Sequence, residues 1–155
     1  MRLVALFFAL ASACARFDKQ KFEPVRRAGT ALQVELASSG GTTPQSTTLL
    51  RTFQTEVAML DGRTAEGRER DVLAAYQEAA DALMLFVRFR ALDLESVNGR
   101  ILVMGTNLDA AQRYKLSLIR IGDGEWVDAG DALKTFHDRG TAALARADRL
   151  VNGQN

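Results

Sequence analysis

The sequence is poor in the residues that build metal and redox sites. Its 155 residues include one cysteine, Cys14, and one histidine, His137. Zinc, copper and haem sites need several such side chains, so few ligands are on offer here. The Glu-x-x-His pairs of di-iron bundles are missing, as are nucleophile-elbow, phosphate-loop and dinucleotide-binding glycine motifs. The sequence therefore predicts no metal, no cofactor and no enzymatic activity.

The chain also lacks an excess of charge of either sign. Its 20 basic and 19 acidic residues leave a net charge of +1. Nucleic-acid binding requires basic residues clustered on one face, and no such cluster occurs, so we expect no nucleic-acid partner. Hydrophobic residues make up 47% and charged residues 25% of the chain, as in an ordinary globular domain. The length fits one domain with a real core.

A long apolar run is missing too. The strongly apolar stretch Leu3–Ala11 has nine residues, whereas a membrane-spanning helix needs about 20. Met1-Arg2 precedes it, small residues follow it, and the chain turns polar at Arg16. This order of charge, short apolar core and small-residue exit is typical of a secretory signal peptide. We therefore expect residues 1–13 to be a signal peptide.

The only cysteine stands at the end of that signal. The stretch Leu10-Ala11-Ser12-Ala13-Cys14 resembles the lipobox of bacterial lipoproteins, in which small residues precede a cysteine whose thiol receives diacylglycerol. The resemblance implies cleavage before Cys14 and acylation of that residue. The family favours leucine three residues before the cysteine, where this chain has Ala11. Ordinary signal-peptidase cleavage after Ala13 or Ala15, giving a secreted soluble protein, is the alternative.

A lone cysteine fits the lipoprotein interpretation. Exported domains normally use cysteines in pairs, and this one stands where lipidation requires it. More than one acyl chain gives a firm membrane anchor. We expect a cell-envelope protein that is anchored to the membrane through acylated Cys14 and faces the periplasm or the cell exterior. Residues 14–22 would form its lipidated tether and residues 23–155 its folded domain.

Helical periodicity dominates the rest of the chain. Apolar residues recur at steps of three and four along four segments. These segments begin with helix-start signals or capping residues at Glu23-Pro24, at Thr43-Pro44, before Ala65 and at Asp128 or Asp131. The third is the longest, Ala65–Leu94. Short loops indicate antiparallel neighbours, so the sequence predicts an all-α bundle of about four main helices.

Residues 96–127 are less regular. Asn98-Gly99 and Gly105 interrupt the chain around the apolar run Ile101–Met104. Lys115–Ile121 partly alternates and leads into a glycine-rich turn, which fits a β-hairpin. A short helix with an irregular loop fits as well. We therefore expect a short irregular or β-hairpin segment before the last helix.

Three residues are candidate ligand or partner contacts. Arg88 and Arg90 lie in a strongly apolar part of the third helix. They either extend outward or pair with an acid, or they face a ligand carboxylate or phosphate. Trp126 is expected in a loop before the last helix, where it covers one end of the bundle or anchors a partner.

Three functions follow from these candidates. The first is a non-catalytic envelope lipoprotein that contacts a protein partner or acts as a scaffold, and it predicts an exposed apolar patch near Trp126. The second is a small-ligand-binding or sensory bundle, with Arg88 or Arg90 in an enclosed cavity. The third, which we do not expect, is a secreted enzyme that brings Glu78 and Asp81 together with His137 in one cleft.

Overall fold

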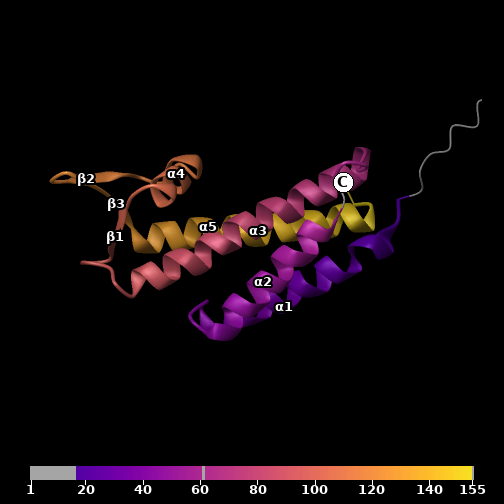
Figure 1. Cartoon of the computed structure of the whole chain (residues 1–155), viewed down its shortest axis with the longest axis horizontal. Helices are drawn as coiled ribbons and strands as arrows, with labels where there is room; N and C mark the ends of the chain where they lie inside the picture. Colours follow the sequence, from indigo (N-terminus) through magenta and orange to yellow (C-terminus); the bar gives the residue numbers. More distant parts are fainter. Residues whose placement is uncertain (1–16, 61, 155) are drawn as a thin grey trace, which may run out of the picture.

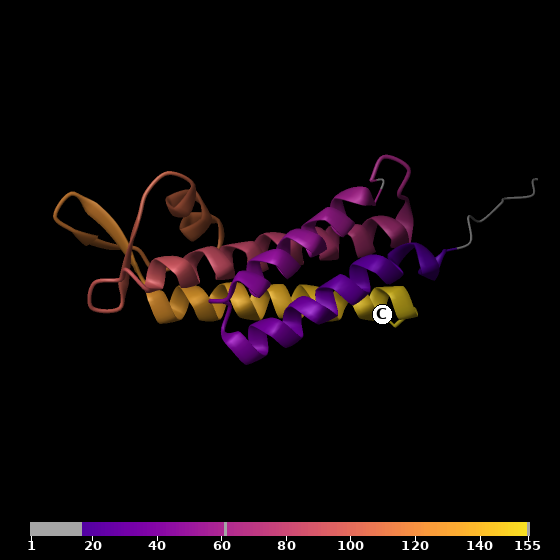
Figure 2. The ribbon, with the colours of Figure 1, turned by 60° about the horizontal axis from the view of Figure 1, so that its bottom comes forward.

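The computed structural model describes residues 17–60 and 62–154, and helices dominate this part of the chain. Two long helices, α3 and α5, lie side by side, with α1 and α2 packed along them (Figure 1 and Figure 2). The elements are η1 (Lys19–Phe22), α1 (Glu23–Ser39), α2 (Pro44–Met59), α3 (Gly67–Asp93), β1 (Arg100–Val103), α4 (Thr106–Arg113), β2 (Ile119–Ile121), β3 (Gly124–Asp128) and α5 (Ala129–Asn152). The predicted all-α bundle with a small β segment before the last helix is confirmed.

The first two helices separate where the sequence predicts a stop and a restart. Gly40 ends α1 in the left-handed conformation, with φ of 65°, and its N–H donates to the carbonyl of Leu36. The Thr43 hydroxyl then accepts the N–H of Ser46 at 3.1 Å, and Pro44 opens α2. A left-handed glycine at a helix end and a threonine–proline start are the local signals that place this boundary.

Helices α3 and α5 share the most extensive contact in the molecule. Leu83, on the central part of α3, is fully buried and faces Gly140 of α5. A Cβ atom added at Gly140 would lie 2.5 Å from Leu83 Cδ2, so only glycine fits there. The close approach explains why α3 is apolar almost all round, because α5 covers one side of it and α2 another.

The segment before the last helix forms a three-stranded sheet. Its strand order is β1-β3-β2, and both pairings are antiparallel. The predicted hairpin alternative is correct: β2 and β3 meet at Gly122-Asp123. Strand β1 follows a tight turn at Asn98-Gly99, where both residues have positive φ. Trp126 lies within β3, whereas the sequence predicts it in a loop.

Residues 17–22, which the sequence assigns to the lipidated tether, contact the bundle through Phe17 and Phe22. The rings of Phe17 and Phe22 stack with centroids 5.5 Å apart, and Phe22 is buried. The guanidinium carbon of Arg68 lies 4.1 Å from the centroid of the Phe17 ring, and Arg68 also donates to the carbonyl of Leu150. One end of the bundle thus holds both Phe17 and the end of α5, and the sheet lies at the opposite end (Figure 1).

Candidate functional site

The predicted lipidation site, Cys14, lies outside the described residues, as does the whole lipobox-like stretch 10–14. The structure places the neighbouring part of the chain. Phe17 lies over Arg68, which donates to the carbonyl of Leu150 near the end of α5, and this end of the bundle is remote from the sheet (Figure 1). Cys14 precedes Phe17 by three residues, a span of at most about 11 Å. A group attached at Cys14 would therefore be held close to that end.

Arg88 and Arg90, the candidate ligand contacts on α3, both have polar neighbours. Arg88 is exposed, and its Nη2 atom donates to Thr106 Oγ1 at 3.0 Å. Arg90 Nη1 lies 2.7 Å from Asp93 Oδ2 in an ion pair one turn along the same helix. These contacts are those of arginines that extend from an apolar helix to its surface. Neither arginine lines the cleft described below.

The sheet turns one face to the helices and the other to solvent. Ile101 of β1 pairs with Val127 of β3, and both are buried. The next row runs across all three strands, from Leu102 to Trp126 to Ile119. Because side chains alternate along a strand and cross-strand partners share a face, this row lies on the opposite side of the sheet from Ile101.

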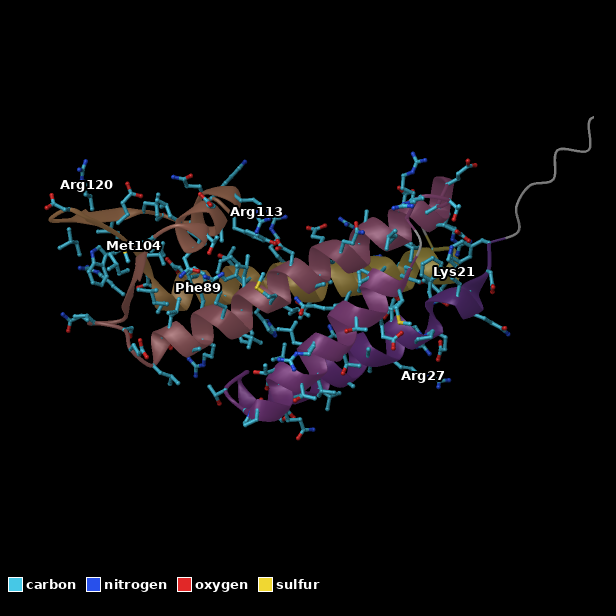
Figure 3. All side chains as sticks on the ribbon, viewed as in Figure 1. Lys21, Arg27, Phe89, Met104, Arg113 and Arg120 are labelled. Carbon is cyan, nitrogen blue, oxygen red and sulfur yellow. The ribbon has the colours of Figure 1, made fainter. Side chains whose placement is uncertain are left out.

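The middle of that opposite side is apolar and partly open, and the exposed pair Arg100 and Asp128 borders it. It carries four residues that we call the outer sheet face: Leu102, Ile119, Ile121 and Trp126. Leu102 and Ile121 expose 38% and 45% of their surface. Met104, which follows β1, exposes 68% and is labelled in Figure 3. The solvent side of an antiparallel sheet is usually polar, so this face is the predicted apolar patch near Trp126.

Trp126 is held in place by packing. Its indole lies against Gly124, where an added Cβ would come within 3.0 Å of the indole nitrogen and 2.8 Å of Leu102 Cδ1. The indole N–H is buried and has no acceptor among the described residues. Trp126 therefore packs on neighbouring residues of the sheet and is half-buried on the outer sheet face.

The two outer strands of the sheet have free edges. Within the described residues β1 and β2 pair with no named strand except β3, although Arg100 at the start of β1 also forms a backbone bridge with Val97. An unpaired strand edge beside apolar side chains is a template for a further strand. Each edge carries one arginine, Arg100 in β1 and Arg120 in β2, and neither strand contains proline. The edges are thus weakly protected against an added strand.

A second feature is an open cleft of about 340 Å³ between α3, α5 and the end of α4. Its walls are formed by Glu78, Asp81, Arg113, Tyr114, Lys115 and Arg139. Glu78 and Asp81 share this cleft, in keeping with their three-residue spacing. His137 is not part of it, and its ring lies 5.3 Å from that of Phe86. The three groups named for acid–base chemistry are not brought together.

Tyr114 fixes the geometry of the cleft. Its ring packs edge-on against the buried ring of Phe136, with centroids 5.1 Å apart. Its hydroxyl donates to Asp81 Oδ2 at 2.9 Å, and Arg113 Nη2 lies 3.0 Å from the same oxygen. Burial, and then the hydrogen bond to Asp81, raise the pKa of Tyr114. The phenol therefore stays protonated at neutral pH and keeps donating to Asp81.

A metal site and a membrane-spanning helix are two further features that residues 17–60 and 62–154 could contain. No three histidine, cysteine or acidic side chains in this part of the chain gather closely enough to hold a metal ion. None of its helices combines the length and the hydropathy needed to cross a bilayer. The outer sheet face and the cleft are the two features to explain.

Sequence reasoning missed several residues of both features. Ile121 had a signal, since apolar side chains alternate with others in its strand, whereas Leu102 lies in a continuous apolar run that does not distinguish the two faces of the strand. Lys115 and Arg139 had none. They come together only because the end of α4 folds back over α3 and α5, a contact that no local pattern encodes.

Comparisons with known proteins were made against protein-family models, curated proteins and solved structures. No family model, no curated protein and no solved structure matches the chain. Function must therefore be argued from the sites themselves, since a bundle fold alone implies none.

Proposed function

We propose that this chain is a non-catalytic cell-envelope lipoprotein, anchored at Cys14, that binds a partner protein through the outer sheet face. The proposal is carried by one observation: the outer sheet face is apolar, open and remote from Phe17 (Figure 1). A large aromatic side chain among exposed aliphatic ones is typical of the central part of a protein interface.

The position of the anchor favours a protein over a lipid surface as the occupant. The link from Cys14 to Phe17 spans at most about 11 Å, so the Phe17 end stays near the membrane. Helix α3 has 27 residues and runs from that end toward the sheet, a length of about 40 Å. The outer sheet face would then stand tens of ångströms from the anchored end, within reach of another envelope protein.

The free edges indicate what the partner presents. An extended segment that adds a strand beside β1 or β2 would gain backbone hydrogen bonds at the edge. Its alternate side chains would lie over the outer sheet face if they are apolar. We therefore expect the partner to contribute an extended apolar segment.

The anchor is tested by the mass and membrane partitioning of the mature protein. Wild type should carry acyl mass on Cys14 and remain in the membrane fraction. The variant Cys14→Ser should lack both properties. Release of unmodified wild-type protein would show that the lipoprotein half of the proposal is wrong and would favour the secreted alternative.

The docking face is tested by cross-linking in cells. A photoreactive residue at Ile121 should give one discrete adduct with another protein. A second change, Leu102→Ser, should weaken that adduct about tenfold or more, because it removes apolar area that the partner would bury and adds a hydroxyl that the partner would have to desolvate. The matched control is the same photoreactive residue at Met59, which is 74% exposed on α2 and should give no such adduct.

Three results would overturn this docking proposal. An adduct of twice the chain's mass would identify a second copy as the occupant. An adduct with lipid would identify a membrane surface. Equal adducts from Ile121 and Met59 would show that exposure alone, and not the outer sheet face, governs the capture.

A further inference from the structure

The residues that line the cleft between α3, α4 and α5 carry more positive than negative charges. The two acids are already paired. Asp81 accepts from Tyr114 and pairs with Arg113, while Glu78 Oε2 lies 2.7 Å from Arg146 Nη2. Any ligand in the cleft therefore meets carboxylates whose charge is compensated. Figure 3 shows Arg113 where α4 approaches α3.

Two cationic side chains that line the cleft have no acidic partner among the described residues. Lys115 and Arg139 both line it and both are exposed. Neither makes an ion pair within 4.0 Å with any residue in the described ranges 17–60 and 62–154. The walls thus carry two positive charges with no counter-charge of their own, on elements that are distant in sequence.

The backbone at Lys115 is a second, independent observation. Helix α4 ends with two hydrogen bonds, from Lys115 N to Gln112 O at 3.0 Å and from Leu116 N to Ala111 O at 2.8 Å. This pattern places Lys115 at the position where helices usually carry left-handed glycine, and its φ is 57°. A lysine there costs stability that glycine would not. The cost is accounted for if the ammonium group is needed in the cleft.

We propose that this cleft binds a small anion with two negative charges, through Lys115 and Arg139. Guanidinium and ammonium groups recognise carboxylate and phosphate oxygens by charge-assisted hydrogen bonds. Arg113 supplies a further cation whose ion pair with Asp81 is exposed enough to be shared. Every lining side chain except that of Tyr114 carries a charge, so the ligand is a dicarboxylate or a phosphate and not an apolar molecule. This inference does not depend on the partner proposed for the sheet.

The test is a calorimetric titration of the full mature chain with succinate and with inorganic phosphate, at physiological ionic strength. One of the two should bind saturably at one site, and which one binds assigns the ligand class. Arg139→Gln and Lys115→Gly should each weaken binding about tenfold or more. The matched control is Arg120→Gln, on the distant β2 strand, which removes the same charge and should leave the affinity unchanged.

Lys115→Gly separates a ligand role from a structural one. Because glycine suits the left-handed backbone, this variant should melt about 2–4 °C higher while losing affinity. If the lysine merely stabilised the end of α4, the variant would melt lower and bind as wild type does, and the proposal would fail. It would fail as well if neither anion saturated at millimolar concentrations, or if Arg120→Gln weakened binding as much as Arg139→Gln.

Discussion

The helix pair α3–α5 and the three-stranded sheet bury their apolar side chains to different extents. In the helix pair, Leu83 is fully buried against Gly140, which is itself buried. In the sheet, Ile101 and Val127 are just as buried on the inner side, yet Leu102 on the outer side is 38% exposed. The apolar contact in the helix pair is thus fully buried, whereas the sheet buries the apolar side chains on one side only.

The difference follows from geometry. Two helices bury their apolar stripes on each other, and α1 and α2 cover further sides of the pair. A three-stranded sheet has two faces, and here the helices cover only one. Complete burial of an aliphatic side chain such as Leu102 is worth about 1.5–3 kcal/mol. Part of that free energy is unrealised on the outer sheet face, and it is available for association.

The largest effect is expected where the two regions join. Phe136 of α5 is buried between the ring of Phe89, 4.9 Å away, and the ring of Tyr114, 5.1 Å away. Phe136→Ala should lower the free energy of unfolding by about 3–5 kcal/mol, because it leaves a cavity. Urea unfolding measures this. Leu102→Ala, on the outer sheet face, should cost about 1 kcal/mol or less. Equal losses of unfolding free energy would show that Leu102 on the outer sheet face is as fully packed as Phe136.

A smaller effect tests the closeness of the bundle itself. Gly140→Ala places a methyl group 2.5 Å from Leu83 Cδ2, and such overpacking costs about 1–3 kcal/mol, against a gain in helix propensity of about 1 kcal/mol. We expect a net loss of up to about 2 kcal/mol by urea unfolding. The control is Gly130→Ala in the first turn of α5, where the new Cβ meets an exposed carboxylate oxygen of Asp128 at 3.2 Å. A harmless Gly140→Ala would mean that α3 and α5 can separate freely.

The helices were predictable because their signals are local. Thr43 and Asp128 cap helices as the sequence predicts, each accepting a backbone N–H three residues ahead. The sheet was only partly predictable. The hairpin of β2 and β3 is local, but β1 pairs with residues more than twenty positions away, Arg100 with Asp128. The dipeptide Asn98-Gly99 interrupts the apolar pattern, and it is also a strong signal for a tight turn that opens a strand.

The cleft was the least predictable part. The three-residue spacing placed Glu78 and Asp81 on one face of a helix, but not what faces them. Tyr114, which donates to Asp81, is 33 residues away in sequence. The left-handed backbone of Lys115 has no sequence signature, since glycine is the residue that normally marks it. Contacts of this kind depend on tertiary packing, which periodicity does not encode.

The smallest predicted effect concerns a weak point within the well-packed bundle. Asp148 of α5 is half-buried, and no cation within the described ranges lies within 4.0 Å of its carboxylate. Burial raises the pKa of this carboxyl above its ordinary value of 3.8, and the more distant Arg26 only partly opposes the change. The folded state therefore binds the proton more readily than the unfolded state, so this group's stabilising contribution is complete at low pH. It is lost as the pH rises through the raised pKa.

Asp148→Asn should accordingly be more stable than wild type at pH 7, by about 0.5 kcal/mol or less because the group is partly solvated. The difference should disappear as the pH falls toward the ordinary pKa of 3.8. Urea unfolding at pH 7 and pH 4 checks both statements. Asp138→Asn, on the same helix, is the control of opposite sign: the hydrogen bond from Lys134 lowers the pKa of Asp138, so its removal should destabilise the protein at pH 7 and matter less in acid. If both variants shifted stability in the same direction at pH 7, then burial of Asp148 and the hydrogen bond from Lys134 to Asp138 would not be what shifts the pKa values of these two carboxyls.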